Sequence, residues 1–142
     1  MLFPGSYGFL DLQIEDRLET ASTVVSADVI DNFADLTGDR FDIHMSDHAA
    51  RELGFSARVA HGLLVLSLID GLKNQSTVTL RAVASLGWDI SFRAPVLAGE
   101  SLRATFEVRD IRPTVTPAMV LRCSKSTHSI SAMRSSKLDG TP

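Results

Sequence analysis

Apolar residues recur at helical spacing in three parts of the first half of the chain. The first part begins after Ser26, a favoured N-cap residue, and ends at Gly38, a residue type common just past a helix. A second, shorter helix is expected over residues 47–53, with Ser46 as its N-cap and Gly54 after its end. The pattern therefore predicts two helices separated by a short connection.

The third helical stretch is apolar on nearly every face. It follows His61 and Gly62 and covers residues 63–72, where Ser67 interrupts a run of leucine, valine and isoleucine. A surface helix would leave one stripe polar, so this helix is expected to be buried on most sides. In a chain this small, some other element has to wrap around it.

Alternating polar and apolar residues predict that wrapper. Residues 77–83, 88–92 and 102–108 each place apolar side chains at a period of two, and glycine or proline separates the runs. Several antiparallel strands after a buried helix give an α+β fold class, with a curved antiparallel sheet around one central helix.

The ends of the chain are less patterned. Residues 1–19 are expected to form a lead-in loop, followed by one strand near residues 20–25. Residues 124–142 contain few apolar side chains and predict either one weak edge strand or a frayed tail. The whole range 1–142 is interpreted as a single domain.

Composition excludes several functional classes. The chain has 142 residues, 44% hydrophobic and 22% charged, which is ordinary for a folded protein and unlike a disordered one. A net charge of -3 argues against a nucleic-acid partner. Cys123 is the one cysteine, so neither an intramolecular disulfide nor a cysteine zinc site is expected. The sequence contains no membrane-length apolar run and no signal-peptide pattern, and a cytoplasmic location is expected.

An aspartate and a histidine fall on the connection between the first two helices. Asp39 follows the helix-ending Gly38, and His44 lies five residues later. A carboxylate that accepts a proton and an imidazole that titrates near neutral pH make a proton-handling pair. The alternative is a solvated turn aspartate and a helix-flanking histidine, which short motifs often turn out to be.

Three further positions are candidates for chemistry. His61 and Gly62 lie where the apolar helix starts, so they either contact substrate or form a tight packed turn. Ser67 either bonds the carbonyl four residues earlier or orients a catalytic carboxylate. Gly87 precedes Trp88 between two strand-like runs, where its N–H is free to face a ligand carbonyl.

Other chemistries have less support. His44 and His48 have the spacing of a helical metal pair, but Ser46 as N-cap leaves His44 outside that helix, so a solvated His48 is expected and no metal site. The sequence has no glycine-rich phosphate loop and no G-x-S-x-G motif.

Together these segments resemble the MaoC-like dehydratase family, which includes the R-specific enoyl-CoA hydratases. The family pattern Gly-Asp-x-Asn-Pro-(Leu/Ile/Val)-His is similar to residues 38–44, which read GDRFDIH. Three later segments also resemble the family in the right order: VAHGLLVLSL at 59–68, LGWDISFRAPV at 86–96 and GESL at 99–102.

The resemblance implies a hotdog fold and a set of roles. Asp39 would act as the main base toward a water that adds to a trans-2-enoyl thioester, and His44 would orient the water and shuttle its proton. Gly87 N–H would bind the thioester carbonyl, a contact typically worth about 2.7–4 kcal/mol in the transition state. Ser67 would orient Asp39, and Phe41 and Trp88 would line the substrate site with His61 and Gly62.

The sequence departs from the family pattern at Phe41 and Asp42, which stand where the pattern has Asn-Pro. Loss of the proline is expected to loosen the segment, because proline restricts its own backbone and that of its neighbour. Phe41 adds bulk near the pocket, and Asp42 brings a second negative charge toward Asp39.

Two other functions are compatible with the same fold. A hotdog thioesterase would need a helix carboxylate, for which Asp70 is the candidate, and a non-catalytic acyl-thioester-binding subunit would tolerate the change at Phe41 and Asp42. No cofactor is expected beyond the CoA or carrier-protein thioester that belongs to the substrate. The expected partner is a second copy of the chain, without nucleic acid or membrane. The cations proposed for phosphate at the rim are Arg40, Arg51, Arg58 and Arg93.

Overall fold

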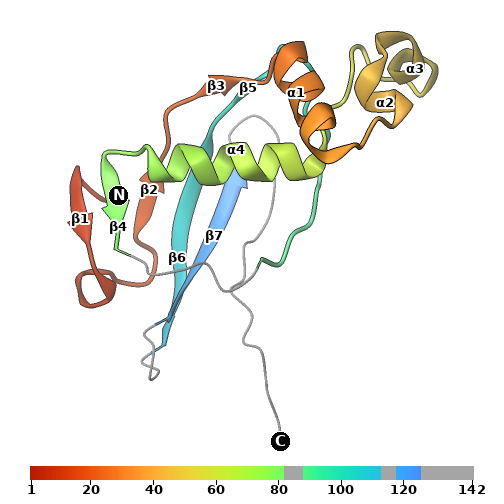
Figure 1. The fold of residues 1–142 in the computed structure, drawn as a ribbon. Coiled ribbons are helices and arrows are strands. Elements are labelled where there is room, and N and C mark those ends of the chain that lie inside the picture. The colour runs from red at the N-terminus through yellow and green to blue at the C-terminus, as the bar shows by residue number, and fades with distance from the viewer. Residues whose placement is uncertain (82–87, 113–117, 126–142) are drawn as a thin grey trace, which may run out of the picture.

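A computed structural model describes residues 1–81, 88–112 and 118–125 (Figure 1). Its strands are β1 (Gly5–Tyr7), β2 (Arg17–Glu19), β3 (Thr23–Val24), β4 (Val78–Leu80), β5 (Ser101–Leu102), β6 (Ala104–Arg112) and β7 (Ala118–Lys125). Its helices are η1 (Phe9–Asp11), a 3-10 turn, α1 (Ala27–Thr37), α2 (Asp42–Met45), α3 (Asp47–Glu52) and α4 (Gly62–Asn74).

The described strands form three sheets with four strand pairings. β2, β6 and β7 pair antiparallel in that order, and β3 pairs antiparallel with β5. β1 and β4 form the exception to the expected antiparallel arrangement, because they pair parallel. Helix α4 lies across one face of β6 and β7, while α1, α2 and α3 gather beyond its N-terminal end (Figure 1).

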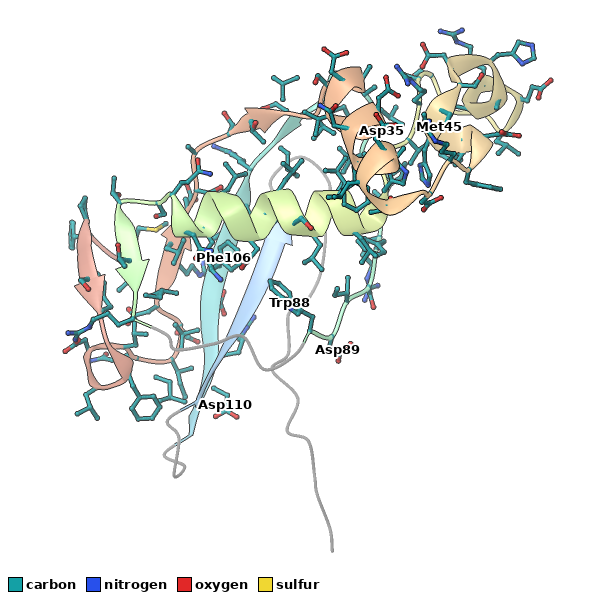
Figure 2. All side chains as sticks on the ribbon, in the orientation of Figure 1. Asp35, Met45, Trp88, Asp89, Phe106 and Asp110 are labelled. Atoms are coloured by element: carbon teal, nitrogen blue, oxygen red, sulfur yellow. The ribbon has the colours of Figure 1, made fainter. Side chains whose placement is uncertain are left out.

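The hydrophobic core lies between α4 and the sheet. Phe106 of β6 is 1% exposed and lies beneath α4 (Figure 2). It belongs to a cluster that includes Leu18, Val65, Ile69 and Leu102. Burial of each such side chain contributes about 1.5–3 kcal/mol, so this cluster holds α4 firmly on the sheet.

Local signals set the bounds of α1 and α3, and both predicted helices are confirmed. Ser26 Oγ accepts the Val29 N–H at the start of α1, and Gly38 ends that helix with φ 79°. Ser46 Oγ accepts the Ala49 N–H at the start of α3. The connection between them is thus held by a helix on either side.

The central helix is confirmed, but its expected burial on most sides is wrong for the single chain. Leu64, Val65, Ile69 and Leu72 are buried, whereas Leu63 is 62% exposed and Ser67 is exposed. The sheet covers the face of the helix that carries the buried residues.

Several other expectations need correction. Residues 1–19 are more than a lead-in loop, since they contain β1 and β2. The alternation over residues 88–92 does not give a strand: Ser91 is an isolated bridge residue, and the chain bends at Ala94 before Pro95, which has no N–H to donate. The four-residue helix α2 was not expected between residues 38 and 46.

The C-terminal part contains a strand that its composition did not predict. β7 pairs with β6 over eight register positions, from Ala104 opposite Lys125 to Arg112 opposite Ala118. The apolar residues proposed for a weak edge strand, Ile130, Met133 and Leu138, lie outside the described residues. Among the described helices, none has both the length and the apolar character that crossing a bilayer requires.

Candidate active site

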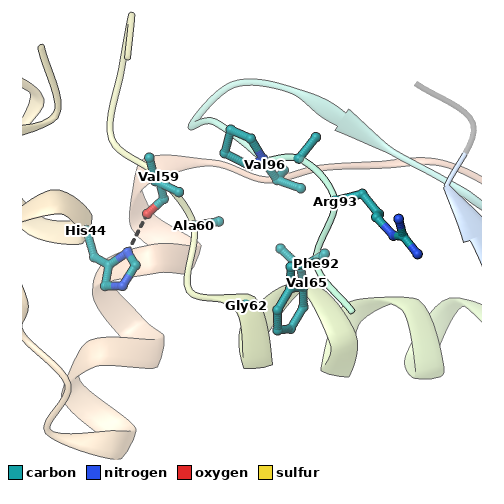
Figure 3. A pocket seen from close by; sticks show the side chains of 10 residues that line it. His44, Val59, Ala60, Gly62, Val65, Phe92, Arg93 and Val96 are labelled. Carbon is teal, nitrogen blue, oxygen red and sulfur yellow. Dashed lines mark hydrogen bonds between the residues drawn. The ribbon is translucent and has the colours of Figure 1, made fainter. Parts of the chain in front are cut away.

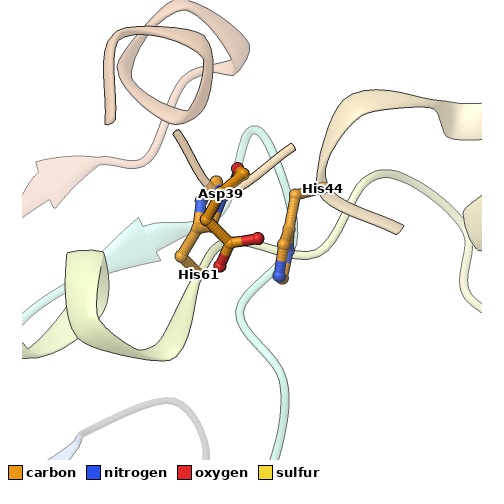
Figure 4. A group of neighbouring side chains, drawn as sticks. All are labelled: Asp39, His44 and His61. Atoms are coloured by element: carbon orange, nitrogen blue, oxygen red, sulfur yellow. The ribbon is translucent and has the colours of Figure 1, made fainter. Parts of the chain in front are cut away.

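Three side chains from separate segments meet beside the N-terminal end of α4. Asp39 follows α1, His44 belongs to α2, and His61 is the N-cap residue of α4. A carboxylate oxygen of Asp39 and one ring nitrogen of each histidine all lie within 4.8 Å of one another. The Asp39 carboxylate points toward the His44 ring (Figure 4). The two residues that the sequence singled out as a pair are therefore brought together.

A backbone carbonyl determines the tautomer of His44. Its Nδ1 lies 2.7 Å from the Val59 carbonyl oxygen, which can only accept, so Nδ1 carries the proton (Figure 3). In the neutral imidazole, Nε2 then holds a lone pair. His44 is half-buried and lines a pocket, so this nitrogen is available as a proton acceptor there.

Asp39 is held by its backbone and one of its oxygens. Its N–H donates to Thr37 Oγ1 at 3.3 Å, and its Oδ1 accepts the Phe41 N–H at 3.3 Å. The carboxylate is exposed, which leaves Oδ2 open to water or a ligand. These contacts order the segment that precedes α2. Asp42, which stands where the family pattern has proline, is the first residue of α2, a position that proline would also fit.

His61 is buried beneath the pair. It is 2% exposed, and its Nε2 donates to the Asp39 carbonyl oxygen at 2.9 Å. Its ring lies against the His44 ring, with centroids 3.9 Å apart and planes tilted by 30°. Its Nδ1 has no hydrogen-bond partner among the described residues. The burial and contacts of His61 match the tight packed turn considered from the sequence. Its contact with substrate remains a prediction.

A pocket of about 360 Å³ opens beside His44 (Figure 3). Its walls are mainly apolar, with Arg93 as the one charged side chain besides His44 among its lining residues. The lining residues are His44, Val59, Ala60, Gly62, Val65, Phe92, Arg93, Ala94, Pro95 and Val96. Such a pocket suits an apolar chain whose reactive end approaches the imidazole.

Gly62 leaves space at the mouth of this pocket. A Cβ at this position would lie 2.7 Å from the Phe92 ring, so the ring can pack here only over a glycine. Gly62 is also the first residue of α4, and its N–H has no intrahelical acceptor. The pocket is therefore lined by a residue whose N–H lacks an intrahelical acceptor, at the positive end of a helix dipole.

The other predicted site residues are more scattered. The Ser67 hydroxyl is exposed and donates to the Leu63 carbonyl oxygen at 2.8 Å, one turn earlier. Phe41 is 65% exposed and lies beside His44, with ring centroids 6.3 Å apart. Trp88 is half-buried and is not among the residues that line the pocket. Gly87 lies outside the described residues, so its proposed N–H contact stays a prediction.

The four arginines named from the sequence have different surroundings. Arg58 donates to Asp31 at 2.7 Å, Arg40 pairs with Asp35, and Arg51 lies 4.0 Å from Asp47. These three are neutralised by acids of the same chain. Arg93 is exposed at the pocket and has no ion pair with the described acidic residues.

A metal ion would find suitable ligand types but poor geometry at Asp39, His44 and His61. One nitrogen of each histidine already donates to a backbone carbonyl. The two rings lie face to face with planes tilted by 30°, an arrangement that is unfavourable for in-plane coordination of one ion by both histidines. The metal pair considered from the sequence does not form, since His48 is exposed and faces Glu52 at 3.7 Å.

Sequence reasoning missed two kinds of site residue. The Val59 carbonyl that orients His44 left no signal, because a backbone acceptor is independent of residue type. Phe92 and Val65 line the pocket, but their periodicity indicated only core positions. The sequence did contain one signal for the pocket: a glycine directly after a histidine at the start of the apolar helix, which is Gly62.

Comparisons of this sequence with known proteins agree on one family. The model of the MaoC like domain matches residues 11–127. A 3-hydroxybutyryl-CoA dehydratase from Methylorubrum extorquens is 34% identical over 105 residues, which cover 74% of this chain and 66% of that protein. An (R)-specific enoyl-CoA hydratase from Aeromonas caviae is 32% identical over 80 residues, which cover 56% of this chain and 59% of that protein. The matched part thus spans less than two thirds of these relatives.

Solved structures agree on the fold. The MaoC-like dehydratase from Rhodospirillum rubrum superposes with a TM-score of 0.76 at 22% identity, covering 88% of this chain and 92% of that one. An R-hydratase from Pseudomonas aeruginosa gives a TM-score of 0.71 at 23% identity, and the match covers 89% of this chain and 81% of that one. The predicted hotdog fold is confirmed, and the chain belongs to the MaoC-like domain family.

Proposed function

We propose that this protein reversibly adds water to trans-2-enoyl thioesters. The observation that carries the proposal is the meeting of the Asp39 carboxylate and the His44 imidazole, within 4.8 Å, beside a mainly apolar pocket. A water that donates one hydrogen to each of two acceptors spans about 4.5 Å between them with hydrogen bonds of about 2.8 Å. The spacing therefore suits a single water held by both groups.

The two acceptors orient the lone pairs of that water. Asp39 Oδ2 and His44 Nε2 each accept one of its hydrogens, so its oxygen lone pairs face the pocket. Asp39 takes one proton as the water oxygen bonds to C3 of the substrate and the C2–C3 double bond opens. His44 keeps the water oriented and shuttles the proton, which ends on C2. The net change is addition of one water, and the reverse sequence removes it.

Negative charge grows on the thioester oxygen during this step. The free Gly62 N–H at the start of α4 is the described donor positioned to receive it, with the helix dipole in support. The Gly87 N–H remains a second predicted donor from the resemblance.

The substrate is proposed to carry a phosphate on its thiol portion. Arg93 supports this, because it is the pocket arginine without a described acidic partner, whereas Arg40, Arg51 and Arg58 are paired. CoA and the phosphopantetheine of a carrier protein both present such a phosphate. A guanidinium binds phosphate with paired N–H groups.

An absorbance assay tests the activity. Purified protein is mixed with crotonyl-CoA and with longer trans-2-enoyl-CoAs, and loss of the enone absorbance is followed. We expect turnover of at least one of them, with formation of the 3-hydroxyacyl product. Release of free thiol in place of hydration would indicate the thioesterase alternative. Binding with no conversion of any enoyl thioester would support a non-catalytic acyl-thioester subunit and refute the proposal.

A further inference from the structure

Four aromatic rings form a continuous row through the candidate site. The Phe41 and His44 centroids are 6.3 Å apart with planes at 66°, and the His44 and His61 centroids are 3.9 Å apart at 30°. The row ends at Phe33, 5.1 Å from His61 at 52°. It runs from the exposed Phe41 to the half-buried Phe33, so His44 lies between a solvent-facing ring and a buried one.

His61 contacts both members of the proposed catalytic pair. Its Nε2–H donates to the Asp39 carbonyl oxygen, while its ring packs on His44. Its own backbone is fixed, because its carbonyl accepts the Val65 N–H in the first turn of α4. One buried side chain thus transmits the position of α4 to both the carboxylate and the imidazole.

His44 needs such support because, among the described residues, its ring is held by one hydrogen bond, from Nδ1 to the Val59 carbonyl oxygen. One hydrogen bond defines the direction of one ring edge but leaves the ring free to tilt about that bond. Ring contacts restrict that tilt, since an aromatic pair is worth about 0.5–1.5 kcal/mol beyond its burial. Phe41 supplies such a contact at a position where the family pattern has asparagine.

We propose that His61 and Phe41 clamp the His44 imidazole, so that both act as positioning residues that keep Nε2 directed at the pocket. The proposal rests on the proposed hydration for its effect on rate, but the clamp itself is a property of the free protein. His61 Nδ1 is buried and has no partner among the described residues, so the contact of Nε2 with the Asp39 carbonyl oxygen is the hydrogen bond that orients this ring.

Three variants separate the contributions. His61→Phe keeps a ring against His44 but loses the donor to Asp39, and His61→Gln keeps an N–H donor at a similar reach but loses the ring. Phe41→Leu removes the exposed edge of the clamp, and Phe3→Leu is its matched control, since Phe3 is 79% exposed at the N-terminus. Because Phe41 is exposed, its replacement leaves the core intact and keeps the test valid if a His61 variant fails to fold.

Two measurements are made on each variant. The first is kcat and KM with crotonyl-CoA. We expect kcat to fall on the order of 10- to 100-fold in both His61 variants and a few-fold in Phe41→Leu, with KM within about two-fold, because small misplacement of a catalytic group costs rate more than binding. Phe3→Leu should match the wild type.

The second measurement is the ¹⁵N NMR spectrum of the imidazoles in the free protein, with His44 assigned by its loss in His44→Gln. In the wild type we expect a single tautomer with the proton on Nδ1. In His61→Phe, His61→Gln and Phe41→Leu we expect the two nitrogen shifts to move toward each other as the ring samples other orientations.

The outcomes distinguish the two proposals. Unchanged His44 shifts and unchanged kcat in His61→Gln and Phe41→Leu, with an active wild type, would overturn the clamp and leave the hydration standing. Altered shifts with a wild type that converts no enoyl thioester would support the clamp and refute the hydration.

Discussion

At its C-terminal end, helix α4 satisfies its own polar groups, whereas at its N-terminal end it leaves several without partners. Near the C-terminus, Lys73 donates to Asp70 at 2.6 Å, and the Gln75 N–H reaches the Gly71 and Lys73 carbonyls. At the N-terminus, no described side chain caps the first turn, the Gly62 N–H has no intrahelical acceptor, and His61 Nδ1 is buried without a described partner. Unsatisfied groups cost free energy, so the N-terminal end of α4 is the end that offers groups to a ligand, in line with the proposed site.

The largest effect is expected at the N-terminal end for Asp39→Asn. The amide cannot take a proton from water, so kcat should fall by about 10²- to 10⁴-fold. Asp39 is exposed, so the thermal unfolding midpoint should change little. The matched control is Asp35→Asn, which removes an exposed carboxylate paired with Arg40. Equal hydration rates in Asp39→Asn and the wild type would contradict the proposed base.

A methyl group at the first residue of α4 should block the pocket. In Gly62→Ala the new Cβ meets the Phe92 ring at 2.7 Å, and this ring, 51% exposed, has to move across the pocket mouth. We expect kcat/KM to fall roughly 10- to 100-fold through misplacement of the substrate, with little change in stability.

Gly71→Ala is the matched control on the same helix, because the nearest atom to its Cβ is 4.0 Å away. This variant should keep its activity and gain about 0.5–1 kcal/mol of stability, since alanine favours the helix over glycine. Similar activity in the two alanine variants would remove the functional difference between the ends of α4.

Arg93→Gln tests the proposed phosphate contact. We expect KM for an enoyl-CoA to rise about 10-fold, because a charge-assisted contact is worth about 1.5–3 kcal/mol. KM for the same enoyl group on N-acetylcysteamine, which lacks phosphate, should not change. Arg51→Gln serves as the control, since Arg51 already faces Asp47. An equal rise in KM for both substrates would place Arg93 at the acyl portion instead.

Substitution of Asp70 tests the C-terminal end of α4. Asp70 lies eight residues after Gly62, about 12 Å along the helix, and is paired with Lys73. Asp70→Asn should cost about 0.3–1 kcal/mol of stability in urea unfolding and leave kcat unchanged. A loss of thiol-releasing activity in this variant would favour the thioesterase alternative.

The smallest effect is expected beyond α4, at Asp11. The Gly8 N–H, followed by Arg81, lowers the pKa of this carboxyl below 3.8. Its contribution to stability is therefore complete above pH 3.8 and is lost as the pH falls through the lower native value. Asp11→Asn should flatten the acid limb of stability measured against pH, while hydration at neutral pH stays unchanged.

Sequence reasoning succeeded where local chemistry decides the structure. Ser26, Ser46 and Gly38 mark helix ends because their side chains or backbone conformations satisfy the terminal groups on the spot. The place of Asp39 and His44 on one connection suggested a pair, and the order of the family motifs favoured it over a solvated turn, but their meeting depends on how α1 and α2 pack.

It failed where tertiary contacts override the local pattern. Residues 88–92 alternate like a strand, yet Phe92 packs over Gly62 and lines the pocket. Helix α2 is too short to show a period, and its first turn is held by contacts of Asp39 that no pattern of residue types reveals. The contacts of His61 with Asp39 and His44 likewise join residues that lie 22 and 17 positions apart in the chain.

The backbone of Val59 contacts three neighbours. Its carbonyl holds the His44 ring, its N–H donates to Ile43, and the residue forms a bridge to Leu97 at the end of the pocket wall. Any attempt to widen the cavity for bulkier acyl groups by shifting this backbone would therefore also turn the imidazole. We expect redesign of chain-length preference to succeed through the side chains of Val65 and Val96, which shape the cavity without carrying the base.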